Sequence, residues 1–184
     1  YHPAMRDEFD LPRQRNLQIP DDEKYALEAV IGQMGAAGLA DSDKIDALRQ
    51  YFLKGFNYSL DLLGKEEYAT PLGNFLLHRK SGFCEYYATA TALLLRMMGI
   101  PSRYAVGYAV VERSWLERRY VVRERHAHAW AEAFVDERWQ IVDTTPPNWA
   151  EQDGQGASAF EGIADIFSFI RHKYQLFRIG SGTD

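Results

Sequence analysis

The chain contains a single cysteine, Cys84, near the start of the segment "GFCEYYATATALLLRMMG". This segment is predicted to be a helix, and Ser81 or Gly82 ends the loop before it, so Cys84 falls in the first helical turn. The positive end of the helix dipole and the free amide groups there favour the thiolate, which is the nucleophilic form of a thiol. The same amide groups can stabilise an oxyanion on a substrate carbonyl. A nucleophile and a structural cysteine both remain open at this point.

Two histidines lie about forty residues downstream, in "ERHAHAWAEAFV". If this segment is a strand, alternate side chains share a face. The large side chains then share one face, and these are His126, His128, Trp130, Glu132 and Phe134. The alanines between them form the other face, which is small enough for another element to approach closely. A histidine on this strand could serve as the base for Cys84 if the sheet packs on the N-terminal end of the helix.

Asp143 follows "WQIV", a short apolar stretch predicted to be the next strand. A carboxylate there can hold the tautomer of a neighbouring histidine and stabilise its imidazolium form, although an aspartate also commonly caps a strand end. The alternative of a zinc site would use His126 and His128 with Cys84 or Asp143. The lack of a second cysteine and the helix-start position of Cys84 favour the nucleophile over the metal site.

The elements that must position these residues follow one another in a simple order. Helices are predicted over residues 20–39, 41–56 and 82–99, and a mixed loop and short-helix region lies between the last two. Strands are predicted over 102–111, over 118–135 as one or two strands, and over 139–145, with "DERW" as a turn. Helices followed by closely spaced strands predict an α+β fold, in which an antiparallel sheet packs on the central helix.

The composition is typical of one well-packed domain of 184 residues, with 46% apolar residues and a net charge of −5. The negative charge disfavours nucleic acid as a partner, and the longest apolar stretch is interrupted by Arg96 and is too short to span a bilayer. We expect a lead-in over residues 1–20, a catalytic domain over 21–150, and a linker with an amphipathic helix over 151–184. That helix either packs on the domain or leads to a membrane or partner surface. The abrupt start without methionine suggests a piece of a longer chain.

Three blocks in this order, "GFCEYYATATALLLRMMGIPSRYAVGY", "HAHAWAEAF" and "RWQIVDTT", resemble the transglutaminase-like superfamily. More narrowly they resemble the bacterial membrane-anchored transglutaminase-like domains, over about residues 42–147. The resemblance implies a cysteine-protease-like fold and a triad of Cys84, His128 rather than His126, and Asp143. Trp130 and His126 are expected to support the site. Tyr58 either supplies a hydroxyl to the oxyanion or simply packs in the core.

One departure from the family pattern follows the acid. The family usually has Asp-Pro-Thr where this chain has Asp143-Thr144-Thr145, so the loop after the acid can differ. The acid itself is retained, and we therefore expect an active triad.

The resemblance implies cysteine-dependent acyl transfer on carboxamides, of the protein-glutamine gamma-glutamyltransferase type, through a thioester and without a cofactor. Water in place of an amine would make the same machinery a cysteine peptidase, amidase or deamidase. A catalytically silent binding module is a further alternative. The resemblance also implies a periplasmic or otherwise extracytoplasmic domain of a membrane-anchored parent. Its expected substrates are proteins or peptides of the cell envelope.

Overall fold

The computed structural model describes residues 11–61, 68–114, 118–123 and 126–150. The described chain divides into two compact units. The first contains the described residues among 11–107 and 127–149, and the second contains those among 108–126 together with Ala150. The linker and amphipathic helix predicted over 151–184 lie outside the described residues.

The helices of the first unit lie where the sequence predicts them. A 3₁₀ turn at Asp21–Glu23 leads into α1 (Lys24–Met34), and α2 covers Asp41–Gly55. The central helix, α4, covers Cys84–Met97. Gly35 and Gly99 follow α1 and α4 with φ of 62° and 84°, a left-handed conformation that ends a helix at little cost for glycine.

In the region predicted as mixed loop and short helix, the described residues form four short elements. Strand β1 (Asn57–Tyr58) pairs in parallel with β2 (Ser81–Gly82). Between them lie α3 (Pro71–Gly73) and the π-helical turn η4 (Asn74–Arg79). Near the N-terminus, a 3₁₀ turn, η2 (Gln14–Leu17), places Asn16 so that its side-chain amide donates to the carbonyl oxygen of Ser102 at 3.3 Å.

A three-stranded sheet follows, in the order β3 (Ser102–Tyr108), β6 (Ala127–Val135) and β7 (Arg138–Val142). Strands β6 and β7 are antiparallel, with Val135 opposite Arg138. The two residues between these partners, Asp136 and Glu137, have φ of 52° and 59°. Two left-handed residues form the tight hairpin turn whose twist matches that of the strands, and the predicted turn is confirmed.

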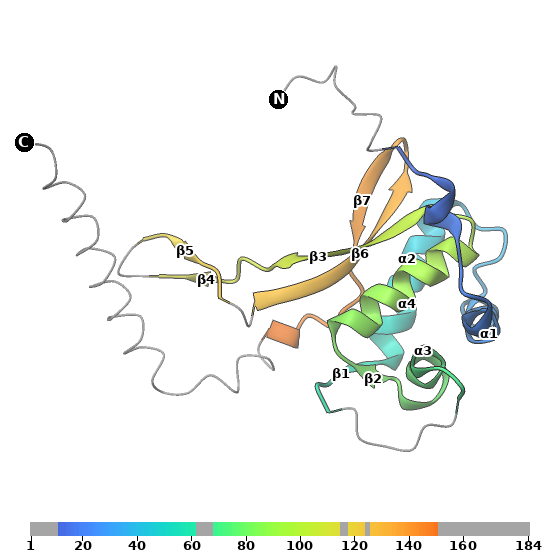
Figure 1. Ribbon diagram of the computed structural model, residues 1–184, viewed down its shortest axis with the longest axis horizontal. Coiled ribbons are helices and arrows are strands. Elements are labelled where there is room, and N and C mark those ends of the chain that lie inside the picture. The colour runs from blue at the N-terminus through green and yellow to red at the C-terminus, as the bar shows by residue number, and fades with distance from the viewer. Residues whose placement is uncertain (1–10, 62–67, 115–117, 124–125, 151–184) are drawn as a thin grey trace, which may run out of the picture. The chain divides into compact units, whose positions relative to one another are not determined.

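The alanine face of β6 packs on α4, as its small size predicts. The side chains on this face are buried at Ala129, Ala131 and Ala133. Helix α4 lies along β6, and α1 is also in contact with α4 (Figure 1). Behind α4, an aromatic cluster fills the space toward α2 and η4, with ring centroids 4.8–6.3 Å apart. Its members are Phe52, Phe56, Phe75 and Tyr87. Tyr87 belongs to the first turn of α4, so this packing holds that turn in place.

The second unit contains a small hairpin. Strand β4 (Glu112–Arg113) pairs with β5 (Tyr120–Val121) in antiparallel register. The segment 118–135, which the sequence predicts to form one or two strands, contains two, β5 and β6. Across the described residues, no helix combines the length and the apolar character that a membrane crossing needs.

Candidate active site

Cys84 is positioned by the parallel pairing of β1 and β2. Tyr58 lies opposite Gly82, and a Cβ atom at Gly82 would meet the Phe75 ring at 3.2 Å. Phe83 is extended, with φ of −106° and ψ of 177°, and α4 begins at Cys84. Cys84 is partly buried, and the side chain of Phe83 does not cap the helix. The uncapped amide groups of the first turn therefore lie at the end of α4 that carries Cys84.

His128 and Asp143 form the second part of the site. His128 Nε2 lies 2.7 Å from Asp143 Oδ2, and the histidine is only 8% exposed. The backbone N–H of Thr145 donates to Asp143 Oδ1 at 2.9 Å and holds the carboxylate in place. Because Nε2 is engaged by Asp143, only Nδ1 of the imidazole is available to a thiol.

The electrostatics link Cys84 to this pair. Burial lowers the pKa of His128, but hydrogen bonds and charge interactions with Asp143 and Cys84 outweigh it and raise the pKa to about 9. Burial raises the pKa of Asp143, while the hydrogen bonds with His128 and Thr145 bring it below its ordinary value. The arrangement therefore keeps an imidazolium beside a carboxylate at neutral pH. Among the described atoms, His128 Nδ1 is buried and has no hydrogen-bond partner.

Trp149 covers the imidazole and was not anticipated from the sequence. Its ring stacks on that of His128 with centroids 4.1 Å apart and an interplanar angle of 5°. The indole is 8% exposed, and the backbone N–H of Trp149 donates to the carbonyl oxygen of Pro146 at 3.1 Å. A tryptophan within a few residues of the predicted acid was the available signal, but its target depends on how the chain turns.

Trp130 and Tyr58 lie near the site in different ways. The Trp130 ring is 6.1 Å from that of His128, and it packs so tightly on β3 that a Cβ atom at Gly107 would lie 2.8 Å from it. Tyr58 is buried on β1, opposite Gly82 and therefore beside the segment that leads into Cys84. Both positions are compatible with the supporting roles expected from the sequence.

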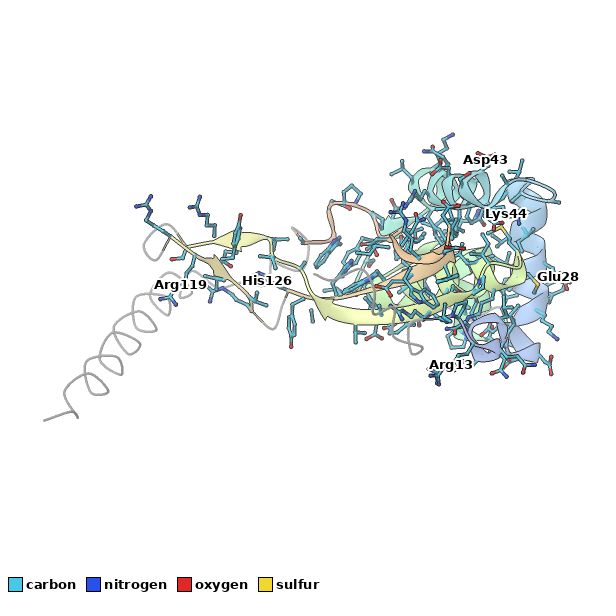
Figure 2. The ribbon with its side chains drawn as sticks, turned by 90° about the horizontal axis from the view of Figure 1, so that it is seen from above. Arg13, Glu28, Asp43, Lys44, Arg119 and His126 are labelled. Carbon is cyan, nitrogen blue, oxygen red and sulfur yellow. The ribbon has the colours of Figure 1, made fainter. Side chains whose placement is uncertain are left out.

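His126 belongs to the second unit and has partners of its own there. The backbone N–H of Arg123 donates to His126 Nδ1 at 3.1 Å, and His126 Nε2 lies 3.6 Å from Glu112 Oε2 beside the β4–β5 hairpin (Figure 2). Within the described ranges, no group of three or more His, Cys, Asp and Glu side chains is arranged to hold a metal ion.

Thr144 occupies the position where the family pattern has proline. Its hydroxyl lies 2.6 Å from that of Thr91 in α4, and both side chains are buried. The loop that carries Asp143 is thereby tied directly to the helix that carries Cys84.

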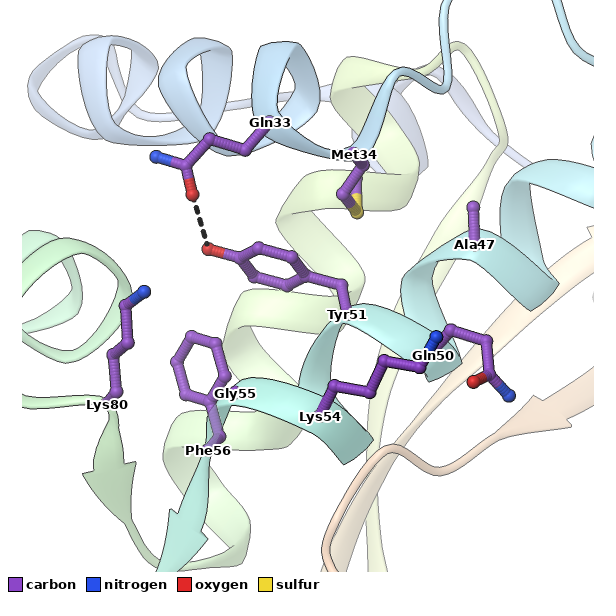
Figure 3. A pocket seen from close by; sticks show the side chains of 9 residues that line it. All are labelled: Gln33, Met34, Ala47, Gln50, Tyr51, Lys54, Gly55, Phe56 and Lys80. Carbon is purple, nitrogen blue, oxygen red and sulfur yellow. Dashed lines mark hydrogen bonds between the residues drawn. The ribbon is translucent and has the colours of Figure 1, made fainter.

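Two surface cavities differ in their relation to Cys84. One, of about 370 Å³, lies between α1, α2 and Lys80. There the Tyr51 hydroxyl donates a hydrogen bond to the side-chain oxygen of Gln33 (Figure 3). None of the three predicted catalytic residues lines it. Another, of about 340 Å³, is lined by Phe83, Glu85 and Tyr86, which are neighbours of Cys84 in the sequence. Cys84, His128 and Asp143 do not line this cavity either.

Comparison with known proteins places these features in a family. The sequence pattern described as the transglutaminase-like superfamily matches residues 28–144. A protein-glutamine gamma-glutamyltransferase of Pseudomonas aeruginosa is 34% identical over 146 residues, which is 78% of this chain and 22% of that protein. The crystal structure of the periplasmic domain of TgpA from Pseudomonas aeruginosa superposes with a TM-score of 0.67 at 32% identity, over 78% of this chain and 51% of that chain.

A crystal structure from Cytophaga hutchinsonii shares the fold at greater distance. It has a TM-score of 0.51 at 20% identity, and the match covers 71% of this chain and 41% of that chain. The chain spans about a fifth of the curated relative from Pseudomonas aeruginosa and about half of the solved periplasmic domain.

Proposed function

Because the chain belongs to the transglutaminase-like superfamily, we propose that it catalyses cysteine-dependent acyl transfer on protein or peptide carboxamides. The observation that carries this proposal is the 2.7 Å contact between His128 Nε2 and Asp143 Oδ2, together with the influence of Cys84 on the pKa of His128. The three residues come from the start of α4, from β6 and from the position after β7 of an α+β, cysteine-protease-like fold, and we infer that they act together.

In the first step, the thiolate of Cys84 attacks the carboxamide carbon, and the carbonyl oxygen becomes an oxyanion. Amide groups of the first turn of α4 donate to that oxyanion, with the Tyr58 hydroxyl in support. The oxyanion collapses, the C–N bond breaks, and the His128 imidazolium gives its Nδ1 proton to the departing ammonia. A thioester on Cys84 and a neutral imidazole remain.

In the second step, a primary amine attacks the thioester carbon while His128 accepts the proton that the amine loses. The C–S bond breaks, the thiolate is restored, and an isopeptide bond has formed. Asp143 keeps the imidazole oriented through Nε2 in both steps and stabilises its charged form.

Hydrolysis is the second candidate, because Cys84 is not fully buried and a thioester reacts with water as well as with amines. Water as the acceptor gives deamidation, or peptide cleavage when the carbonyl belongs to a peptide bond. The residues and their roles stay the same. The two candidates differ only in the nucleophile of the second step.

We further propose that the domain acts outside the cytoplasm, on proteins or peptides of the cell envelope, as part of a membrane-anchored parent. Support comes from the similarity to a solved periplasmic domain. The test is to add protease to intact spheroplasts that express a tagged full-length parent protein. A domain that stays protected from the protease would contradict the proposal.

The activity test measures incorporation of a fluorescent primary amine into a glutamine-containing acceptor protein, together with release of ammonia. Incorporation that is lost in Cys84→Ala and His128→Gln, and kept in the matched control His78→Gln, supports transamidation. Ammonia release or cleavage without incorporation, again dependent on Cys84, would assign hydrolysis instead. Activity that survives Cys84→Ala would overturn the role of the thiol.

A further inference from the structure

The imidazole of His128 has one face covered by an aromatic ring that the mechanism above does not use. The Trp149 ring lies 4.1 Å from it, nearly parallel, at 5°. Both side chains are 8% exposed. A stack of this closeness in a buried setting constrains the plane of the imidazole, because tilting the ring would drive it into the indole.

The plane of that ring matters for the geometry of the site. The imidazole must direct Nε2 at Asp143 Oδ2, 2.7 Å away, and Nδ1 at the Cys84 thiol at the same time. Asp143 fixes one edge of the ring through a single contact, which still permits rotation about that contact. A flat surface against the ring face removes the remaining freedom.

The indole also bears on the charge of the ring. An imidazolium over the face of an indole is attracted by its quadrupole, and the attraction is stronger where water is excluded. The titratable groups whose charges act on His128 are Cys84 from α4 and Asp143 after β7. The other aromatic neighbour, Trp130, lies farther off at 6.1 Å and 27°.

A backbone turn holds Trp149 where its indole can stack on His128. The backbone N–H of Trp149 donates to the carbonyl oxygen of Pro146, closing a turn that begins shortly after Asp143. One short segment after β7 therefore supplies both the carboxylate at the edge of the ring and the indole on its face.

We propose that Trp149 is a positioning residue for acyl transfer, which holds the His128 imidazole in the plane joining Cys84 to Asp143 and stabilises its protonated form. The inference rests on the proposed function for its catalytic consequence. The stack itself can be tested without any activity.

The experiment compares Trp149→Phe with Trp149→Leu. Removing the indole also admits water, and rehydration acts on the His128 pKa in the opposite sense, so the informative comparison is between two replacements of similar size. Phenylalanine keeps an aromatic face and leucine does not. Trp139→Leu is the matched control, since that indole packs on Phe134 and Arg103 rather than on His128.

The first measurement is NMR titration of the His128 ring proton in each protein, assigned with His128→Gln. We expect the pKa of His128 in Trp149→Leu to lie about one pH unit below that in Trp149→Phe, and to be unchanged in Trp139→Leu. Equal pKa values in the phenylalanine and leucine variants would overturn the stabilisation by the ring face.

The second measurement is the pH profile of kcat and kcat/KM for amine incorporation. We expect the alkaline limb to move with the NMR value and kcat to fall more than KM rises. If the NMR shift occurs but no protein transfers acyl groups, the stack stands and the proposed function fails. If Cys84-dependent transfer occurs and Trp149→Leu moves neither the pKa nor the alkaline limb, the function stands and the positioning role fails.

Discussion

The hydroxyl groups of Thr91 and Thr144 lie 2.6 Å apart in the interior and join the helix of Cys84 to the loop of Asp143. Thr91 is fully buried and Thr144 is nearly so. The family pattern has proline in place of Thr144, which stiffens a loop by fixing φ. Here a side-chain hydrogen bond performs the comparable task of fixing where the carboxylate lies relative to α4.

The first prediction concerns this pair. Thr144→Val leaves the buried Thr91 hydroxyl without its partner, and we expect a loss of about 1–3 kcal/mol in the free energy of unfolding. Adding Thr91→Val should recover part of that loss, because both polar groups are then gone. Urea denaturation of the two single variants and the double variant measures the coupling. Strictly additive losses would show that the two hydroxyl groups do not interact.

The second prediction concerns pH. The pKa of His128 is raised from 6.5 to about 9, so the imidazolium persists at neutral pH and is lost as pH rises through about 9. Acyl transfer, which needs that proton, should fall in the same range. Alkylation of Cys84 by iodoacetamide needs no proton donor and should not fall there. A transfer rate that stays level to pH 10 would contradict the assignment of His128 as the acid.

The same shift affects stability. A folded-state pKa above the unfolded value means that protonation of His128 favours the folded protein. This contribution is complete below about pH 6.5 and is lost as pH rises through about 9.

Asp143→Asn removes a hydrogen bond and a charge that raise the pKa of His128. In this variant, the alkaline limb of the pH profile of acyl transfer should therefore lie at lower pH than in the wild type. The kcat should fall on the order of 10²-fold.

A third prediction concerns the packing behind the site. A Cβ atom at Gly107 would lie 2.8 Å from the Trp130 ring, so Gly107→Ala should displace the indole and cost about 1–3 kcal/mol in the free energy of unfolding. Gly32→Ala is the control, because open space surrounds that position within α1 and alanine favours a helix by about 0.5–1 kcal/mol. Thermal melts of both variants measure this, and Gly107→Ala should have the lower melting temperature. Equal melting temperatures would mean that the indole is loosely held.

A fourth prediction separates packing from catalysis in the histidine strand. Glu132 shares that strand with His128 but pairs with Arg103, which is 40% exposed. Exposed ion pairs contribute little, so Glu132→Gln should cost less than about 1 kcal/mol and leave kcat/KM within a few-fold of the wild type. Asp143→Asn is the comparison in the same sheet. A loss of activity as large in Glu132→Gln as in Asp143→Asn would place Glu132 in the site.

The sequence by itself determined the elements and the approximate position of each predicted catalytic residue. Hydrophobic periodicity located α1, α2 and α4, and two turn residues located the β6–β7 hairpin. The small alanine face of β6 also indicated its packing against a helix. These features depend on residues that are near one another in the chain, where side-chain spacing and backbone preference decide the outcome.

Only the tertiary structure decided which residues surround the imidazole. Strand alternation placed His126 on the same face as His128, whereas His126 belongs to another unit and pairs with Glu112 and Arg123. Likewise, neither the stacking of Trp149 on His128 nor the contact of Thr144 with Thr91 follows from spacing. Such contacts depend on where strands end, how the following loop turns and which side of α4 it meets. Those choices are set by the packing of elements that lie far apart in the sequence.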